Sequence, residues 1–232
     1  MSVETPIEKR RAVASSAGGL VRRVDARGLT ITTAIALAAH EALAELAVGD
    51  ELELLVDPFP AVVPDLQAWC RANGHELFEV SEEGKSRRVR VCKGGAQTHE
   101  QRVAIVVSSD GLEELLSPLG FALAAALGGA RVSVYLQGPA VHVLAPGFRV
   151  RLRGLGRPFS RFARSGLERA GNVAPATKLR QLQSLGGRLY VCGPSLAHFH
   201  VDPNRLAFDE VVVCEYLSFM EVMRQADVQL YT

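Results

Sequence analysis

The chain has 232 residues, of which 48% are hydrophobic and 22% are charged, as is typical of a globular protein with a buried core. Its formal net charge of +1 excludes a uniformly charged surface for nucleic acid or membranes, so such a partner would need a local patch. The four cysteines show no zinc-ligand spacing and the first residues lack the apolar run of a signal peptide, so we expect reduced thiols and a cytoplasmic location.

The first region of the chain is expected to be a disordered lead over residues 1–18, followed by a small two-layer domain over residues 19–94. The hydrophobic pattern of that domain predicts the order β-α-β-α-β-β. The expected elements are a strand at residues 20–25, a helix at 34–46, a strand at 51–56, a helix at 62–73, and strands at 76–81 and 87–93. Thr30, Thr32 or Thr33 is expected to cap the first helix.

A polar linker at residues 95–100 separates this domain from a second one at residues 101–232. The strands of the second domain are continuous apolar runs, as in a parallel sheet that is buried on both faces. The expected strands lie at residues 102–108, 131–136, 189–191 and 227–231, and the expected helices at 112–127, 141–144, 175–185 and 216–226. Residues 208–214 are ambiguous. Because strands and helices alternate, the fold class is α/β with a doubly wound parallel sheet.

Residues 146–175 form a long insertion in the second domain, and it is rich in arginine. Loops of this length are often functional or mobile. Seven arginines stand against the single acid Glu168, and they are Arg149, Arg151, Arg153, Arg157, Arg161, Arg164 and Arg169. The first four are candidates for binding an acidic partner protein or nucleic acid, and a solvated mobile loop is the alternative. Nucleic acid is not the expected partner, because no clear aromatic pattern of an RNA-binding module accompanies them.

Cys192 directly follows the apolar strand at residues 189–191 and precedes Gly193 and Pro194, which break the strand. A thiol at the carboxyl end of a strand lies where ligands gather in open α/β sheets. A helical turn capped by Ser195 would also favour its thiolate. We therefore expect Cys192 to be exposed and to be the most reactive cysteine. The alternative is a small buried hydrophobe.

Other candidate residues lie near Cys192 in the sequence. His198 and His200 follow it closely, but a solvated histidine pair is a better interpretation than a Cys/His/His metal site. Cys214 is either a resolving thiol or part of the core, and Cys70 and Cys92 are interpreted as packing residues. Neither a metal nor a cofactor is expected, because there is no zinc pattern and no Walker loop. No uncharged stretch reaches the about 20 residues of a membrane span.

Three segments of the first region carry a family resemblance. They are Val24-Asp-Ala-Arg-Gly-Leu29, Val48-Gly-Asp-Glu-Leu-Glu-Leu-Leu-Val-Asp-Pro58 and Trp69-Cys-Arg-Ala-Asn-Gly-His-Glu-Leu77. Residues 19–94 thereby resemble the TusA/SirA-like family of small sulfur carriers. In that family a Cys-Pro-x-Pro motif follows the Gly-Leu, and its Cys holds a persulfide. Ile31 stands in that place, so the resemblance implies a degenerate module for docking or dimerisation.

The second region resembles another family through Arg102-Val-Ala-Ile-Val-Val-Ser108, Leu189-Tyr-Val-Cys192 and the ending Phe219-Met-Glu-Val…Ala-Asp-Val-Gln-Leu-Tyr231. These segments are similar to the DsrE/DsrF-like family, in its larger subclass with a long insertion. There, a Cys at the place of Cys192 is the candidate persulfide carrier. Gly193 and Pro194 replace more usual polar or Met residues, and the insertion is Arg-rich rather than Met-rich.

Together the two resemblances imply a sulfur-trafficking protein that carries a persulfide on Cys192, with sulfur donor and acceptor proteins as its partners. They also imply a homo-oligomer. Two alternatives remain open from the residues alone. One is a non-catalytic binding module that uses the arginine-rich insertion, and the other is a redox switch formed by Cys192 and Cys214.

Overall fold

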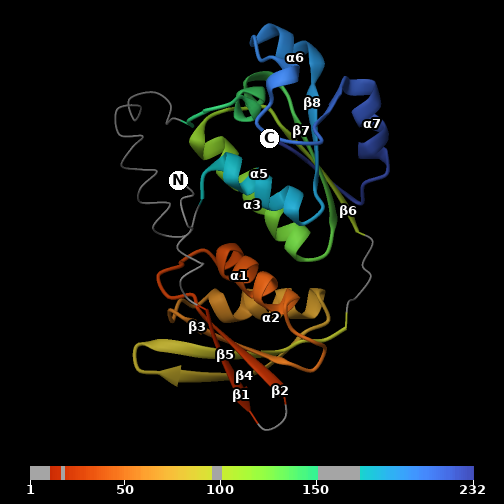
Figure 1. Ribbon diagram of the computed structural model, residues 1–232. Helices are drawn as coiled ribbons and strands as arrows, with labels where there is room; N and C mark the ends of the chain where they lie inside the picture. Colours follow the sequence, from red (N-terminus) through yellow and green to blue (C-terminus); the bar gives the residue numbers. More distant parts are fainter. Residues whose placement is uncertain (1–10, 17–18, 96–100, 151–172) are drawn as a thin grey trace. The chain divides into compact units, whose positions relative to one another are not determined.

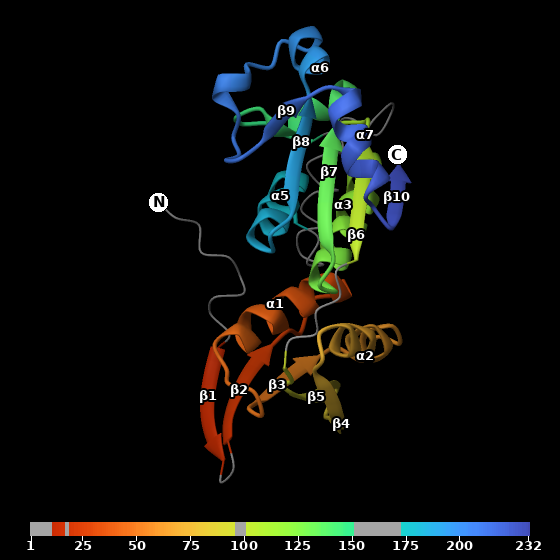
Figure 2. The same cartoon turned by 90° about the vertical axis from the view of Figure 1, so that its right-hand side faces the viewer.

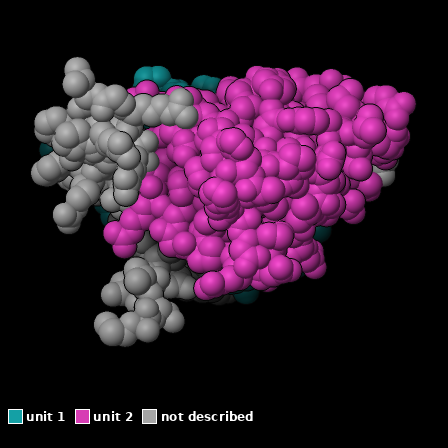
Figure 3. All heavy atoms as spheres, turned by 90° about the horizontal axis from the view of Figure 1, so that it is seen from above, with its two compact units in different colours: residues 1–98, 169–172 teal, residues 99–168, 173–232 magenta. Residues whose placement is uncertain are grey.

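The computed structural model describes residues 11–16, 19–95, 101–150 and 173–232, and Figure 1 shows their arrangement. The chain divides into two compact units between residues 98 and 99 (Figure 3). Each unit has its own sheet, so the two are described separately.

The first unit is a two-layer α/β sandwich. Its strands are β1 (Arg11–Ser16), β2 (Gly19–Asp25), β3 (Glu51–Val56), β4 (Glu76–Glu83) and β5 (Ser86–Cys92), and its helices are α1 (Thr32–Ala44) and α2 (Val62–Ala72). The strand order is β1-β2-β3-β5-β4, and only the β2–β3 pair is parallel.

The two helices of the first unit cover one face of its sheet (Figure 1). β3 illustrates why, because Leu52, Leu54 and Val56 are buried while Glu51 and Glu53 lie on the other face. Such period-two alternation is typical of a strand with one face against a core.

The exposed face of the first sheet carries a ladder of opposite charges across adjacent strands. Arg23 on β2 and Arg88 on β5 both pair with Glu53 on β3. Arg90 on β5 pairs with Glu51 and, at 2.8 Å, with Glu79 on β4. Among the side chains that the structure describes on this face, acid and base are thus matched across the strands.

Two expectations for the first unit need correction. The lead at residues 1–18 is not wholly irregular, because β1 pairs antiparallel with β2 over Arg11–Ser16. The two strands form a hairpin in which Ser16 pairs with Gly19. The sequence Arg-Ala-Val-Ala-Ser-Ser of β1 does not alternate between polar and apolar residues, so its own pattern does not predict a strand. The expected threonine cap of α1 is also wrong, because Ile31 occupies the N-cap position and makes no side-chain cap hydrogen bond.

The second unit is an α/β domain with a five-stranded sheet. Its strands are β6 (Arg102–Val107), β7 (Arg131–Leu136), β8 (Arg188–Cys192), β9 (Val212–Cys214) and β10 (Val228–Tyr231). Its helices are α3 (Leu112–Leu127), α5 (Pro175–Ser184), α6 (Gly193–His198) and α7 (Tyr216–Arg224), with the 3-10 helices η2 (Gly138–Leu144) and η4 (Pro203–Arg205).

The strand order of the second sheet is β10-β6-β7-β8-β9, and all neighbouring pairs are parallel. Figures 1 and 2 show α3 and α5 on one face of the sheet and α7 on the other. The expected doubly wound α/β class is therefore confirmed. Coverage of both faces also explains why β6 is an unbroken apolar run, with every residue after Arg102 buried.

The face under α7 holds a small separate core. It consists of Ala104, Val106, Tyr135, Cys192 and Phe219, with partly buried apolar side chains packed around them. α7 contributes Phe219, whose ring stacks on Tyr135 with centroids 4.6 Å apart. Within the described ranges, no helix has the length and apolar character that crossing a bilayer requires.

Candidate functional site

Cys192 is the last residue of β8 and the N-cap of α6, as the Gly193-Pro194 sequence predicts. Pro194 can begin the helix because its missing N–H would have no intrahelical partner in the first turn. Ser195 does not cap the helix. Its Oγ instead accepts a hydrogen bond from Gly138 N at 2.9 Å, which joins the loop after β7 to the loop after β8.

The predicted exposure of Cys192 is wrong, because its exposed fraction is only 1%. The cover comes from α7, a distant segment of the chain. Phe219 packs on Tyr135 and also meets Tyr190 edge-on, with ring centroids 5.2 Å apart. The thiol thus lies in an apolar layer between the sheet and α7, and a reagent reaches it only if this cover moves.

The pKa of Cys192 is nevertheless lowered from its ordinary value. Burial alone raises the pKa of this thiol, but donors to the sulfur outweigh that effect. They are the Ser195 hydroxyl, the Tyr135 hydroxyl, the Ser195 backbone N–H and the Tyr216 hydroxyl. Because the Gly138 N–H occupies one lone pair of Ser195 Oγ, the single hydroxyl proton of Ser195 remains for the sulfur.

The Tyr135 hydroxyl is the most informative of these donors. It is buried without a partner of ordinary hydrogen-bond geometry among the described residues, and the polar group that it approaches is the Cys192 sulfur. An unsatisfied buried hydroxyl costs free energy. A thiolate accepts a hydrogen bond more strongly than a thiol. Ionisation of Cys192 would therefore satisfy the Tyr135 hydroxyl, which is one cause of the lowered pKa of this thiol.

Cys214 lies directly beside Cys192, because the two residues are register partners on the adjacent parallel strands β8 and β9. Both side chains belong to the face under α7, and both thiols are free. The pKa of Cys214 is raised, first by burial and then by the charge of Cys192. The pair thus joins a thiol whose pKa is lowered to a neighbouring thiol whose pKa is raised.

Polar side chains outside the sequence-based predictions complete this edge of the sheet. Gln137 Nε2 donates to Ser108 Oγ at 3.1 Å and to Tyr231 Oη at 2.6 Å. Asp110 and His142 form a second pair at 3.0 Å. The available signal was the polar residue that directly follows each apolar strand, Ser108 after β6 and Gln137 after β7, at the edge where parallel-sheet sites form.

The two histidine candidates do not join the thiol site. His198 is the last residue of α6, is exposed and contacts Phe199 edge-on. His200 lies beyond the helix in a left-handed backbone conformation, with φ of 54°. In the part of the chain that the structure describes, no three or more His, Cys, Asp or Glu side chains gather as metal ligands.

The remaining candidates lie elsewhere. Cys70 is buried inside α2, and burial raises its pKa to about 12. Cys92 ends β5, with its Sγ 3.7 Å from the Gly49 carbonyl. Arg149 is exposed at the start of the insertion, whereas Arg151, Arg153 and Arg157 lie outside the described residues.

Each of the two units matches a protein family. Residues 22–93 match the family described as sulfurtransferase TusA, and residues 101–231 match the DsrE/DsrF-like family. These families are related to sulfur relay, so a general sulfur-trafficking role is supported. No curated protein matches the chain. Among solved structures, the ychN protein from E. coli is 18% identical, with a TM-score of 0.41, and the match covers 58% of this chain and 100% of that one.

Proposed function

The chain belongs to the DsrE/DsrF-like family, and from that premise we propose that it carries sulfane sulfur as a persulfide on Cys192. The observation that supports this proposal is the set of donors around a buried thiol. Ser195, Tyr135 and Tyr216 lower the pKa of Cys192 in an apolar layer where burial alone would raise it. Nucleophilic sulfur chemistry requires the thiolate, so these donors prepare the residue for transfer.

In the proposed reaction, the Cys192 thiolate attacks the outer sulfur of a donor persulfide. A new S–S bond forms at Cys192 Sγ while the S–S bond of the donor breaks, and the donor leaves as a thiolate. An acceptor thiolate then attacks the outer sulfur on Cys192 and restores the Cys192 thiolate. No net oxidation occurs in either step. The hydrogen-bond donors that favour the Cys192 thiolate also stabilise it as the leaving group when sulfur passes to the acceptor.

Burial gives the persulfide protection and makes access a separate step. Cys192 is buried in the same small core as Phe219 of α7, so a donor or acceptor protein must displace this cover before sulfur moves. Once the cover returns, water and unrelated thiols are excluded from the outer sulfur. The proposal therefore includes partner proteins that engage the α7 side of the second unit.

Cys214 is proposed as a resolving thiol. If its thiolate attacks the inner sulfur of a Cys192 persulfide, a Cys192–Cys214 disulfide forms and the outer sulfur leaves as sulfide. Neighbouring parallel strands are about 4.8 Å apart, which falls within the Cα separation range of disulfides. The same register supports the second candidate function, a reversible thiol switch at Cys192 and Cys214.

The first unit is proposed to be a docking or dimerising module. Ile31 stands at the start of α1 where the resemblance places a carrier cysteine, and an isoleucine has no sulfur to load. A homo-oligomer is also proposed. Its support is a group of exposed apolar side chains on β9 and α7, namely Val212, Val213, Leu217 and Met220. Light scattering at several protein concentrations measures the assembly.

A cytoplasmic location belongs to the same proposal, because free thiols persist in a reducing compartment and all four cysteines are free. A binding role for the arginine-rich insertion is tested by titrating an acidic partner protein across a salt series. Charge reversal at Arg149, Arg151 and Arg153 should weaken that binding, and unchanged affinity would favour a solvated loop.

The persulfide proposal is tested by incubating the protein with a low-molecular-weight persulfide and mapping the product by mass spectrometry. We expect one added sulfur atom on Cys192 in the wild type or, if Cys214 resolves it, the loss of two hydrogens with release of sulfide. Cys214→Ser should retain the added sulfur. Cys192→Ser should remain unmodified at this position, while the matched Cys70→Ser variant should load normally. Loading of Cys192→Ser to the wild-type extent would contradict the proposal.

A further inference from the structure

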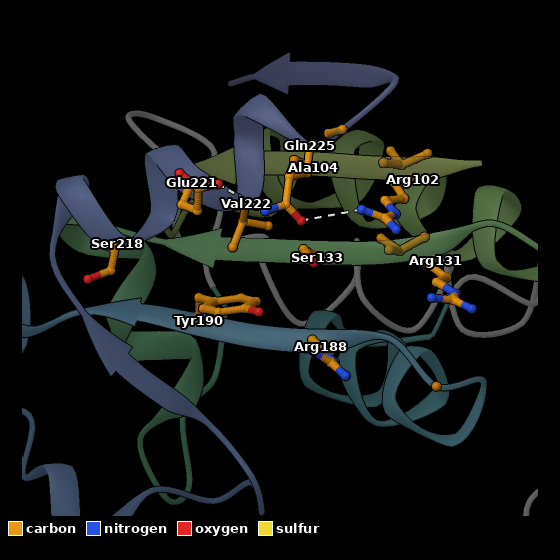
Figure 4. A pocket seen from close by; sticks show the side chains of 14 residues that line it. Arg102, Ala104, Arg131, Ser133, Arg188, Tyr190, Ser218, Glu221, Val222 and Gln225 are labelled. Atoms are coloured by element: carbon orange, nitrogen blue, oxygen red, sulfur yellow. Dashed lines mark hydrogen bonds between the residues drawn. The ribbon is translucent and has the colours of Figure 1, made fainter. Parts of the chain in front are cut away.

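Each unit has a pocket that is lined in part by basic side chains. Figure 4 shows the pocket between the second sheet and α7, where the Arg102 guanidinium donates to Gln225 Oε1 at 3.3 Å. The Arg102 backbone N–H donates to the Asp227 carboxylate at 2.7 Å, and Arg131 also has an interaction partner. Arg102 and Arg131 are thus engaged within the chain, so this pocket gives no basis for a ligand.

The pocket of the first unit has a volume of about 210 Å³ and lies where α1 and β5 end. Its basic lining residues are His40 on α1, His75 directly before β4 and Lys93 directly after β5. None of the residues that line it is acidic. Sites for drug-sized ligands measure about 300–1,000 Å³, so this smaller pocket suits a small ligand that basic side chains recognise.

Lys93 is held in place by its backbone and by its side chain. Its N–H donates to the Asp50 carbonyl and its carbonyl accepts from the Gly49 N–H, both at 2.8 Å. Its Nζ donates to the carbonyls of Leu43 and Leu46 at 2.6 Å each, at the partly negative end of α1. An ammonium has three N–H donors, so one donor of Lys93 remains for a ligand.

His75 supplies a second donor, because its tautomer is fixed. The Gly94 N–H donates to His75 Nδ1 at 3.2 Å, so the proton of the neutral ring is on Nε2. Trp69 contacts the ring edge-on, with centroids 5.5 Å apart. This close approach requires glycine at position 94, since a Cβ there would collide with the Gly74 carbonyl oxygen. Nε2 therefore offers an N–H, which suits an anion and not a metal cation.

The two histidines and Lys93 also influence one another electrostatically. Burial is the main cause of a lowered pKa at both His40 and His75, and the Lys93 charge lowers both further. His40 contributes to the lowered pKa of His75, whereas the Glu41 charge acts in the opposite direction on His40. An anion among these groups would favour protonation of both rings, and each protonated ring would gain a donor.

We propose that this pocket binds a small oxyanion with two negative charges, of the sulfate or phosphate type, through Lys93, His40 and His75. The three donors come from separate segments and can each meet a different oxygen of a tetrahedral oxyanion, whereas a carboxylate has only two oxygens. The site would give the first unit a ligand although Ile31 leaves it no sulfur to carry. It does not depend on the persulfide proposal for Cys192.

The test is a nuclear magnetic resonance titration of the full chain, with labelled histidine, against sodium sulfate at constant ionic strength. We expect the ring signals of His40 and His75 to shift saturably, while those of the exposed His198 and His200 do not. Sulfate stays fully ionised near neutral pH, so changes in its affinity report the protein. Between about pH 7.5 and pH 5.5 the affinity should rise about tenfold, because histidine protonation adds a charge-assisted hydrogen bond.

Phosphate and acetate define the ligand class at about pH 6. We expect acetate, with one charge and two oxygens, to bind at least about tenfold more weakly than sulfate or phosphate. The tighter of the two tetrahedral ions identifies the preferred oxyanion. Acetate binding as tight as that of both would overturn the assignment of the pocket to a dianion.

His40→Gln and Lys93→Gln should each weaken sulfate binding about tenfold at about pH 5.5. Their matched controls are His198→Gln and Lys85→Gln, because both residues are exposed and do not line the pocket. Lys93 also contacts the end of α1, so His40→Gln is the deciding variant. The proposal is overturned if sulfate does not shift His40 and His75 saturably, if its affinity does not change with pH, or if His40→Gln binds as tightly as His198→Gln.

Discussion

Cys70 in the first unit and Cys192 in the second are buried to nearly the same degree, with 2% and 1% exposure. The pKa values of their thiols are nevertheless shifted in opposite directions. Cys70 lies inside a helix, where burial raises its pKa to about 12. Cys192 lies where a strand passes into a helix, and hydroxyl and backbone donors there lower its pKa despite burial. Burial therefore raises the pKa of a thiol where no hydrogen-bond donor contacts the sulfur, and such donors can reverse the shift.

The largest expected effect comes from opening the cover of each thiol. Phe219→Ala removes a ring from the small core that contains Cys192, and Leu66→Ala removes a buried side chain one helical turn from Cys70. Each variant should lose about 2–5 kcal/mol of unfolding free energy, the usual cost of such cavities. Only Phe219→Ala should also accelerate alkylation of the nearby cysteine, because donors lower the pKa of Cys192 whereas burial raises that of Cys70. Chemical denaturation measures the loss of stability, and peptide mass spectrometry measures the alkylation rates. An equal acceleration of Cys70 alkylation in Leu66→Ala would contradict the difference assigned to the two thiols.

The two thiols should also give opposite pH dependences of stability. The folded pKa of Cys70 is about 12, above the about 8.5 of an unfolded thiol, so its contribution is full below about pH 8.5 and declines above it. By about pH 10 the loss should reach about 2 kcal/mol relative to Cys70→Ala. For Cys192 the folded pKa is the lower one, so its contribution is full above about pH 8.5 and is lost as the pH falls through its folded pKa.

Urea unfolding of the wild type, Cys70→Ala and Cys192→Ser across this pH range measures both contributions as differences from the wild type. Other groups that titrate in alkali cancel in these differences. A contribution of Cys70 that did not change between about pH 8.5 and pH 10 would contradict the effect assigned to its burial.

A smaller effect is expected from removing one donor. Tyr135→Phe should raise the pKa of Cys192 by roughly one unit, equivalent to about 1.4 kcal/mol, because the thiolate loses a buried hydroxyl partner. At pH below that pKa the loading rate should fall by up to about tenfold with the thiolate fraction. Stability should change little, since Tyr135 Oη has no other partner among the described residues. The matched control is Tyr190→Phe, and an equal loss of loading in that variant would argue against a specific role for Tyr135.

Much of this fold follows from local patterns. Continuous apolar runs predict the parallel strands β6 and β7, and the switch to alternation marks β3 as a half-covered strand. The position of Cys192 at a strand end also follows, because Gly193 and Pro194 cannot continue a buried strand. The pairing of β1 was not predictable in this way, since it depends on a neighbour rather than on its own periodicity.

The environment of Cys192 was less predictable than its position. Cys192 is buried in a small core to which α7 contributes Phe219, and two of its donors, Tyr135 and Tyr216, come from distant parts of the chain. These residues meet only because of the parallel register and because α7 returns to the second face of the sheet. The sequence left open whether Cys214 is a resolving thiol or part of the core. The register of β8 with β9 shows that its neighbour is Cys192.

We propose that buried donors lower the pKa of Cys192 and thereby favour the thiolate that sulfur transfer requires. The most direct test of this proposal is the pH dependence of Cys192 alkylation in a variant with Cys70, Cys92 and Cys214 replaced by serine, followed by intact mass. We expect the alkylation rate to rise with a midpoint below pH 8.5, the approximate pKa of a free thiol, and we expect this midpoint to move to higher pH when Tyr135→Phe is added. A midpoint at or above the free-thiol value, unchanged by Tyr135→Phe, would contradict the proposal.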